Sequence, residues 1–450
     1  MAHQVTSKDI PTQGEHLDKS KVARLQTLTG MIAALGLIGS IVYLWVGGGV
    51  ESGGHESNTT HGSYAFSWLF AVFFVLTITF GGCFWTFLHN LSNSGWGTSV
   101  RRLMENLGFV FPFLFVFSIP FLFPQVQQYL WEWMPDYKNA VSQHEGMSAH
   151  DALMHSDNTH DHLLAKKTWY LNPGFWHLRF FAFFILLGGF IYLVRKFSVN
   201  QDSDPNPGTK NLFAARKHSS WSMIIFGVSM TFLALDWVMA LNYAWFSTMF
   251  GVYVFAGSAL SSMAVLILTG LLLQKAGYLE KVVTKEHYHI MGKLSFAFTI
   301  FWAYVSFSQF FLIWYANIPE ETIYFVLRNT ENWNLVSLFL VFFHFALPFL
   351  LLLRSDVKKS PKFMMGLCCY ILFIHAIDVY HMVIPERGPS VGNVVDHHPH
   401  LWIKHSWIGD IIAFVTAVSG FLFFYLRNLT SAALYPHRDP RILESANLHN

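Results

Sequence analysis

Long apolar runs, separated by short polar segments, fill the chain from about residue 25 onward. A helix needs about 20 such residues to cross the hydrocarbon core of a bilayer. Ten runs meet this length, so we predict an all-α polytopic membrane protein with ten transmembrane helices. Their expected bounds are 25–46, 64–91, 105–123, 173–194, 220–243, 249–273, 291–315, 333–353, 363–383 and 407–426.

The distribution of Lys and Arg predicts the orientation of these helices. The N-terminal tail, every second loop after it and the C-terminal tail together hold 21 of these residues, against six in the other loops. The positive-inside rule then places the tails 1–24 and 427–450 in the cytoplasm, on either side of a membrane domain spanning 25–426. The longest outer loop covers 125–172. Pro112 and Pro120 predict an interruption of the third helix.

The ninth span, FMMGLCCYILFIHAIDVYHMV, carries His375, Asp378 and His381 within its apolar sequence. Residues three apart lie about 60° from each other around a helix, so these three side chains fall on one face. A carboxylate at bilayer depth costs about 2.5–3.5 kcal/mol on insertion scales. We therefore expect this face to point at a protein interior or a hydrated path, either for proton transfer or for hydrogen bonds to neighbouring helices.

Other polar residues inside the spans extend this face into a series that crosses the membrane. Imidazole and carboxyl groups spaced in depth, with waters between them, are what a proton path requires. Two alternatives stay open. Two facing histidines in the middle of the spans could instead ligate a haem, and the polar residues at the span ends could instead be anchors at the membrane interface. The predicted proton path consists of His89, Glu105, Asp236, Lys293, Gln309, His344, His375, Asp378 and His381.

The composition agrees with a membrane protein and excludes several functions. Hydrophobic residues make up 53% and charged residues 12%, where a soluble protein has about 25% charged. A net charge of +2 gives no reason to expect a nucleic-acid partner. The three Cys lie in apolar spans with no spacing typical of covalent haem, zinc or an iron–sulfur cluster. We predict no metal site and no redox centre in this chain.

Histidines gather in two outer loops. Their spacings match no closed metal site, and we interpret both loops as solvated segments that cover a partner. They are His144, His150, His155, His160 and His162 in the first loop, and His397, His398, His400 and His405 in the second.

Two stretches carry a family resemblance: LDWVMALNYAWFSTMFGVYVFAG at 235–257 and HYHIMGKLSFAFTIFWAYVSFSQFFLIWYANIPEET at 287–322. With ten spans and a long loop after the third, the chain resembles an NrfD/polysulfide-reductase-type membrane subunit, the one labelled F, of bacterial alternative complex III. That complex is a quinol:electron-acceptor oxidoreductase. The resemblance covers essentially the whole chain after residue 25.

The resemblance implies a fold, partners and a location. The fold is two four-helix bundles, helices 2–5 and 6–9, flanked by helices 1 and 10. The partners are multihaem cytochrome c subunits, an iron–sulfur subunit and a sister NrfD-like membrane subunit. The electron acceptor is either cytochrome c or a terminal oxidase that receives electrons directly. The haems and clusters sit on those partners, and the location is the bacterial cytoplasmic membrane.

The resemblance also implies a proton path and raises the question of quinone binding. Quinol-oxidising relatives are expected to carry acidic or imidazole groups in the outer half of the first bundle, and here 109–123 has none. The residues of this chain that could bind a quinone are then His177, Arg179 and Asp236. The sister NrfD-type subunit is the other candidate for the quinol site. Two further functions stay open: a proton-coupled secondary transporter, and a purely structural anchor for redox subunits.

Overall fold

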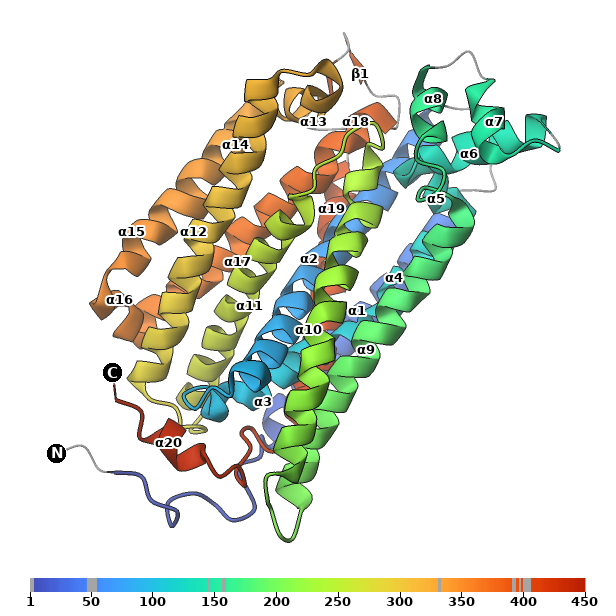
Figure 1. Ribbon diagram of the computed structural model, residues 1–450. Coiled ribbons are helices and arrows are strands. Elements are labelled where there is room, and N and C mark those ends of the chain that lie inside the picture. The colour runs from blue at the N-terminus through green and yellow to red at the C-terminus, as the bar shows by residue number, and fades with distance from the viewer. Residues whose placement is uncertain are drawn as a thin grey trace.

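The computed structural model describes residues 4–46, 55–144, 146–155, 159–330, 333–390, 394–395, 398–399 and 406–449. Within these residues, ten helical segments are long and apolar enough to cross a membrane, as predicted (Figure 1). The protein is an all-α, multi-pass integral membrane protein. The helices that form the spans are α1 (Lys19–Val46), α2 (His55–Ser92), α3 (Thr98–Gly108), α9 (Pro173–Ser203), α10 (Lys210–Trp237), α11 (Phe250–Lys275), α12 (Lys285–Ala316), α14 (Trp333–Leu340), α15 (Leu347–Leu353), α17 (Pro361–Val383) and α19 (Ser406–Leu429).

Shorter elements connect or interrupt the spans. The two β-strands form one short antiparallel ladder. These elements are η1 (Phe111–Leu114), α4 (Phe115–Ser118), η2 (Ile119–Leu122), α5 (Pro124–Leu130), α6 (Trp133–Gln143), α7 (Ala149–Met154), α8 (Thr159–Ala165), η3 (Met239–Leu241), α13 (Pro319–Asn329), η4 (Val341–Ala346), α16 (Ser355–Lys359), η5 (Ile384–Glu386), α18 (Arg387–Ser390), α20 (Ile442–Ala446), β1 (Val394–Val395) and β2 (His398–Pro399).

The spans form the two expected four-helix bundles. The first contains α2, the α3–η2 segment, α9 and α10, and the second contains α11, α12, the α14–α15 segment and α17. Helices α2 and α11 pack against each other where the bundles meet, and they are the two most buried spans. Helices α1 and α19 pair with each other, and α19 packs on α2 and α3 (Figure 1).

The third span is interrupted, as its two prolines predict. Helix α3 ends at Gly108, and short helical turns η1, α4 and η2 continue to Leu122 because Pro112 and Pro120 lack the amide hydrogen of a regular helix. Before this break the backbones of α2 and α3 touch. A Cβ atom added at Gly82 would lie 2.6 Å from the nitrogen of Gly108, so glycine is required for this close approach.

Several helices are longer than their apolar runs predict. Helix α2 starts at His55 instead of 64, α9 ends at Ser203 instead of 194, and α10 starts at Lys210 instead of 220. Polar residues beyond an apolar run do not end a helix by themselves, so these helices extend out of the hydrocarbon layer. The predicted outer loop 125–172 likewise contains short helices, α5 to α8.

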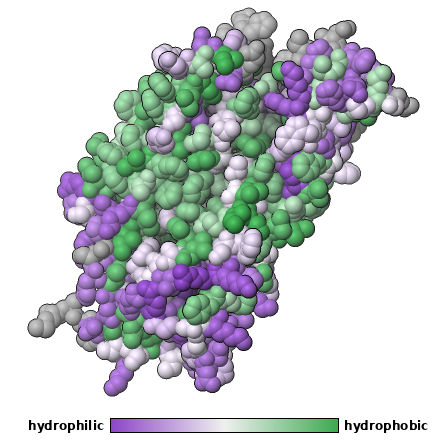
Figure 2. Space-filling model, in the orientation of Figure 1, coloured by the Kyte–Doolittle hydropathy of each residue, from purple (hydrophilic) through white to green (hydrophobic). Residues whose placement is uncertain are grey.

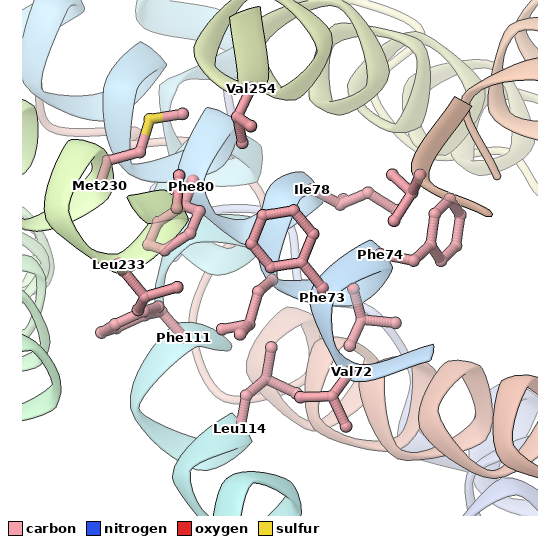
Figure 3. Packing of buried hydrophobic residues seen from close by; sticks show 14 of the residues in the cluster. Val72, Phe73, Phe74, Ile78, Phe80, Phe111, Leu114, Met230, Leu233 and Val254 are labelled. Carbon is pink, nitrogen blue, oxygen red and sulfur yellow. The ribbon is translucent and has the colours of Figure 1, made fainter. Parts of the chain in front are cut away.

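The distribution of apolar residues fits a bilayer. Figure 2 shows a hydrophobic band around the middle of the molecule and hydrophilic residues at both ends. Large exposed side chains in this band include Leu35 and Ile185, which are 73% and 69% exposed. Inside, aromatic residues such as Phe73 and Phe80 of α2 and Phe111 of η1 interdigitate with Leu233 of α10 (Figure 3).

Both tails lie at one end of the bundle, and α5 to α8 lie at the other (Figure 1). The tails are joined by hydrogen bonds, including one from the backbone nitrogen of Val5 to the side chain of Asn447. In the loop containing α6 to α8, the rings of His144 and His155 lie 6.1 Å apart. The side chains of His160, His397, His398, His400 and His405 lie outside the described residues.

Candidate functional site

Three buried titratable side chains meet in the second bundle. His344 comes from η4, and His375 and Asp378 lie one turn apart on α17. A distance of 3.9 Å separates His344 Nε2 from Asp378 Oδ2, and 4.0 Å separates His375 Nδ1 from the same oxygen. All three side chains are at most 2% exposed. We call this group the His/Asp cluster.

The Asp378 carboxylate is held by neutral donors. The Tyr253 hydroxyl donates to Oδ1, and Trp302 Nε1 donates to Oδ2 at 3.1 Å. No Lys or Arg pairs with this carboxylate among the described residues. A buried carboxylate without a cation is costly to keep ionised, so this position is suited to a group that takes up and releases a proton.

The hydrogen-bond network assigns the proton of His375. Thr77 donates its single hydroxyl proton to the carbonyl of Phe74 at 2.6 Å. In the 2.9 Å contact between Thr77 Oγ1 and His375 Nε2, the imidazole must therefore be the donor. This leaves the lone pair of Nδ1 facing Asp378, with no partner among the described residues. Two acceptors that face each other in this way can share one proton.

The local backbone of His344 is irregular. Residues Val341–Ala346 form a π-helical turn just before Pro348, a feature often found at functional sites. The imidazole stacks on Trp302 with ring centroids 3.9 Å apart, and neither ring nitrogen has a hydrogen-bond partner among the described residues. Gly257 of α11 makes room for the cluster, since a Cβ atom there would lie 3.0 Å from His375 Cε1.

The size of the cluster can be compared with the spacing that a bound water or a metal ion requires. One ligand atom from each residue lies within 4.8 Å of the others. A centre that makes tetrahedral hydrogen bonds of about 2.8 Å separates its partners by about 4.6 Å. Zinc, bonded at 2.0–2.1 Å, would separate them by only about 3.3 Å. The separations of 3.9 and 4.0 Å from Asp378 Oδ2 lie between these two values, so the three side chains are spaced around one small ligand, either a water molecule or a metal ion.

A pocket of about 730 Å³, here the lateral pocket, adjoins the cluster between α12, α13 and α14. Tyr253 and Trp302, the two donors to Asp378, form part of its wall. Its outer rim includes Tyr304 and Phe307, which are 65% and 64% exposed in the apolar band. The lateral pocket is therefore accessible from the lipid side and separated from the cluster by two side chains.

Polar groups line one end of the lateral pocket. His381 contacts Ser337 through Nε2 at 3.0 Å, and Ser337 donates to the Arg328 carbonyl, so His381 keeps Nδ1 as an acceptor. Gln309 accepts from Ser247 through Oε1, which leaves its amide hydrogens as donors. Burial raises the pKa of Tyr324 in this wall to about 12, so its hydroxyl stays neutral. An apolar pocket with a few converging polar groups is typical of a ligand site.

The residues predicted for a quinone in the first bundle have a different arrangement. Arg179 binds Asp236 through two hydrogen bonds, 2.7 Å from Nε and 2.9 Å from Nη2, and Tyr170 adds a third at 2.7 Å. His177 is engaged through both ring nitrogens, with Gln127 and with the Pro173 carbonyl. The structure brings Arg179 and Asp236 together as a saturated ion pair, and His177 is not part of it.

The remaining residues of the predicted proton path lie apart from the cluster. Glu105 is buried between Arg101 and Arg102, at 3.4 and 3.0 Å, at the end of the bundle that carries the tails. His89 is buried near the same end. Lys293 is exposed on α12.

Sequence reasoning missed Thr77, Tyr253 and Trp302, which complete the surroundings of the cluster. Tyr253 and Trp302 lie within the two stretches that carry the family resemblance. Trp302 is in the middle of its span, away from the ends where membrane proteins place interfacial aromatic residues, and this position was an available signal. Tyr253 is the fourth residue of α11, so its position gave no such signal. No known family model matches this chain, and no curated protein matches its sequence.

Proposed function

We propose that this chain is an NrfD-type membrane subunit of a quinol-oxidising respiratory complex of the alternative complex III class, and that its second bundle transfers protons. The observation that carries the proposal is the His/Asp cluster, in which Asp378 faces two imidazoles and has no Lys or Arg partner in the described part of the chain. Such a group can hold a proton inside the membrane. The electrons would travel through haems and iron–sulfur clusters of partner subunits, because this chain has no residues spaced to bind them.

This proposal implies a complex with several partner subunits. The partners are multihaem cytochrome c subunits, an iron–sulfur subunit and a sister NrfD-like subunit, with cytochrome c or a terminal oxidase as the electron acceptor. The complex lies in the bacterial cytoplasmic membrane, with both tails in the cytoplasm. The Lys and Arg distribution supports this orientation.

The proton role is tested with Asp378→Asn and His375→Ala in the intact complex. Proton release per quinol is measured in vesicles, together with quinol turnover. We expect both variants to assemble and to lower the proton stoichiometry, whereas the exposed carboxylate variant Asp356→Asn serves as a control that leaves it unchanged. Wild-type stoichiometry and turnover in Asp378→Asn would exclude the cluster as a proton carrier.

Purification of the intact complex separates the two alternative functions, a secondary transporter and a structural anchor. A transporter would work without partner chains, so copurifying haem-bearing subunits would argue against it. A structural anchor would lose assembly on substitution of the cluster, while the complexes that did assemble would keep full turnover and full proton release.

A second role, quinone binding, is favoured by the lateral pocket. This pocket opens toward the lipid, and its lining includes Gln309, whose amide can donate, and His381, whose Nδ1 can accept. A quinone headgroup has oxygens to match such groups and an apolar tail that would remain in the lipid. Binding of a decyl-substituted benzoquinone is expected to weaken about tenfold in Gln309→Leu and to stay unchanged in the neighbouring Ser308→Ala. Equal binding by both variants would refute this role.

A further inference from the structure

A second pocket of about 280 Å³, here the tail pocket, lies at the end of the bundle that carries both tails. It is enclosed by the end of α2, the start of α3, the start of α10 and the segment before α20. Three arginines line it, Arg101, Arg216 and Arg441. This pocket belongs neither to the His/Asp cluster nor to the lateral pocket.

Two side chains of the tail pocket are buried and incompletely bonded. Arg101 is 5% exposed, and its Nη2 has no hydrogen-bond partner among the described residues. His89 is 6% exposed, and its Nδ1 also has no partner among the described residues, but this atom packs against Gly97, where an added Cβ atom would lie 2.6 Å from it. Buried polar atoms are nearly always hydrogen-bonded in folded proteins, so the unpaired Nη2 of Arg101 indicates a ligand that supplies the missing partner.

The charges in the tail pocket favour an anion. The pocket has one carboxylate, Asp439, and Arg101 Nη1 neutralises it at 2.8 Å. Arg441 pairs with Glu444 at 2.6 Å. Arg216 is exposed at the rim and makes no ion pair with a described residue. Arg216 and the free Nη2 of Arg101 therefore offer guanidinium donors that no carboxylate occupies.

Hydroxyl and amide groups complete the donor set. Thr98 and Thr209 line the pocket, as do Asn90 and Ser94. Guanidinium groups together with hydroxyls are the usual partners of a tetrahedral oxyanion, which accepts more hydrogen bonds than a carboxylate does. Phe213 of α10, 63% exposed, adds an apolar edge beside these donors. This combination matches a phosphate group at the surface of a membrane.

We propose that the tail pocket binds a phosphate group, carried either by an anionic phospholipid or by a soluble phosphate compound, with Arg101 and Arg216 as its guanidinium ligands. The proposal is independent of the redox or proton function of the chain. The phosphate oxygens would accept from Arg101 Nη2 and from the Arg216 guanidinium. Binding would also connect α3, α10 and the C-terminal segment.

The test uses the full-length chain, stripped of lipid in detergent together with any copurifying subunits. Its thermal unfolding is followed while phosphatidylglycerol, phosphatidylcholine or inorganic phosphate is added. The variant is Arg216→Gln, which replaces an exposed side chain and so preserves the fold. The matched control is Lys217→Gln, which removes the same charge from the next, exposed residue outside the pocket.

A lipid ligand predicts that phosphatidylglycerol raises the unfolding temperature and inorganic phosphate does not. A soluble ligand predicts that inorganic phosphate raises it. In either case we expect Arg216→Gln to weaken the apparent affinity at least about tenfold, which corresponds to about 1.4 kcal/mol, and Lys217→Gln to change it less than twofold. The proposal fails if no phosphate compound stabilises the chain, or if both variants weaken binding equally.

Discussion

Each bundle buries one aspartate on its last helix, and the two are stabilised in opposite ways. Asp236 in the first bundle accepts two hydrogen bonds from Arg179 and one from Tyr170. Asp378 in the second bundle accepts from Tyr253 and Trp302, and imidazole nitrogens face it at about 4 Å without bonding. The first carboxylate has a permanent counter-charge, whereas the second has no Lys or Arg partner among the described residues.

This difference indicates which carboxylate can exchange protons. A guanidinium stays charged at any accessible pH, so it keeps its carboxylate ionised and in place. Tyrosine and tryptophan donate without carrying charge, so Asp378 can be neutral or ionised depending on the proton content of its neighbours. Depth in the membrane alone does not separate a structural carboxylate from a functional one, whereas the partners of the carboxylate do.

The largest effect is expected from removing the cation of the first bundle. Arg179→Ala would leave Asp236 buried and unpaired, which costs about 3–5 kcal/mol of the free energy of unfolding. Detergent-induced unfolding of the purified protein measures the loss. The double variant Arg179→Met with Asp236→Leu should recover most of it, and a stability loss in the double variant as large as in Arg179→Ala would show that the pairing is not the cause.

The corresponding change in the second bundle should affect stability less. Asp378→Asn removes no Arg or Lys partner, but its amide nitrogen replaces one of the two oxygens that accept from Tyr253 and Trp302, so we expect a loss of about 1–3 kcal/mol of the free energy of unfolding. If the two aspartates differ as described, this variant loses proton transfer while Asp236→Asn loses stability. Equal destabilisation by Asp378→Asn and Asp236→Asn would remove the distinction between the bundles.

The close packing of the His/Asp cluster can be tested through Gly257. An alanine Cβ at this position would lie 3.0 Å from Cε1 and 3.4 Å from Nδ1 of His375, so the imidazole must move. We expect Gly257→Ala to cost about 1–3 kcal/mol and to slow proton transfer. Gly227→Ala on α10 is the control, because nothing lies within 4 Å of its added Cβ. An effect no larger than the control would mean that the cluster tolerates displacement.

The smallest effect is expected for an ion pair outside the membrane. Hydrogen bonds from Arg441 hold the pKa of Glu444 below its usual 4.5. Because the folded-state pKa is lowered, the stabilisation is fully present above pH 4.5 and is lost as the pH falls through the folded-state value. The pair is exposed, so this contribution stays below about 1 kcal/mol. Glu444→Gln should flatten the pH dependence of unfolding in that window, and an unchanged slope would show that the pair contributes nothing.

The amino-acid sequence alone determined the number and approximate position of the spans, because the length of an apolar run is a local property. The prolines of the third span likewise predicted its interruption, and the helical period placed His375 and Asp378 on one face. The helix ends were less predictable, since hydrogen bonding along a helix continues into polar residues. The ends of α2, α9 and α10 therefore lie well beyond the apolar runs.

Only the tertiary structure decided what the polar residues do. Arg179 and Asp236 come from different helices, as do Asp378, Tyr253 and Trp302, so their pairing depends on how the helices pack. The sequence assigned Asp236 and Asp378 to one proton path because both are carboxylates at membrane depth. In the folded protein Asp236 lies against the guanidinium of Arg179, whereas Asp378 lies against the imidazoles of His344 and His375. These neighbours come mostly from other helices, and they determine the chemistry of each aspartate.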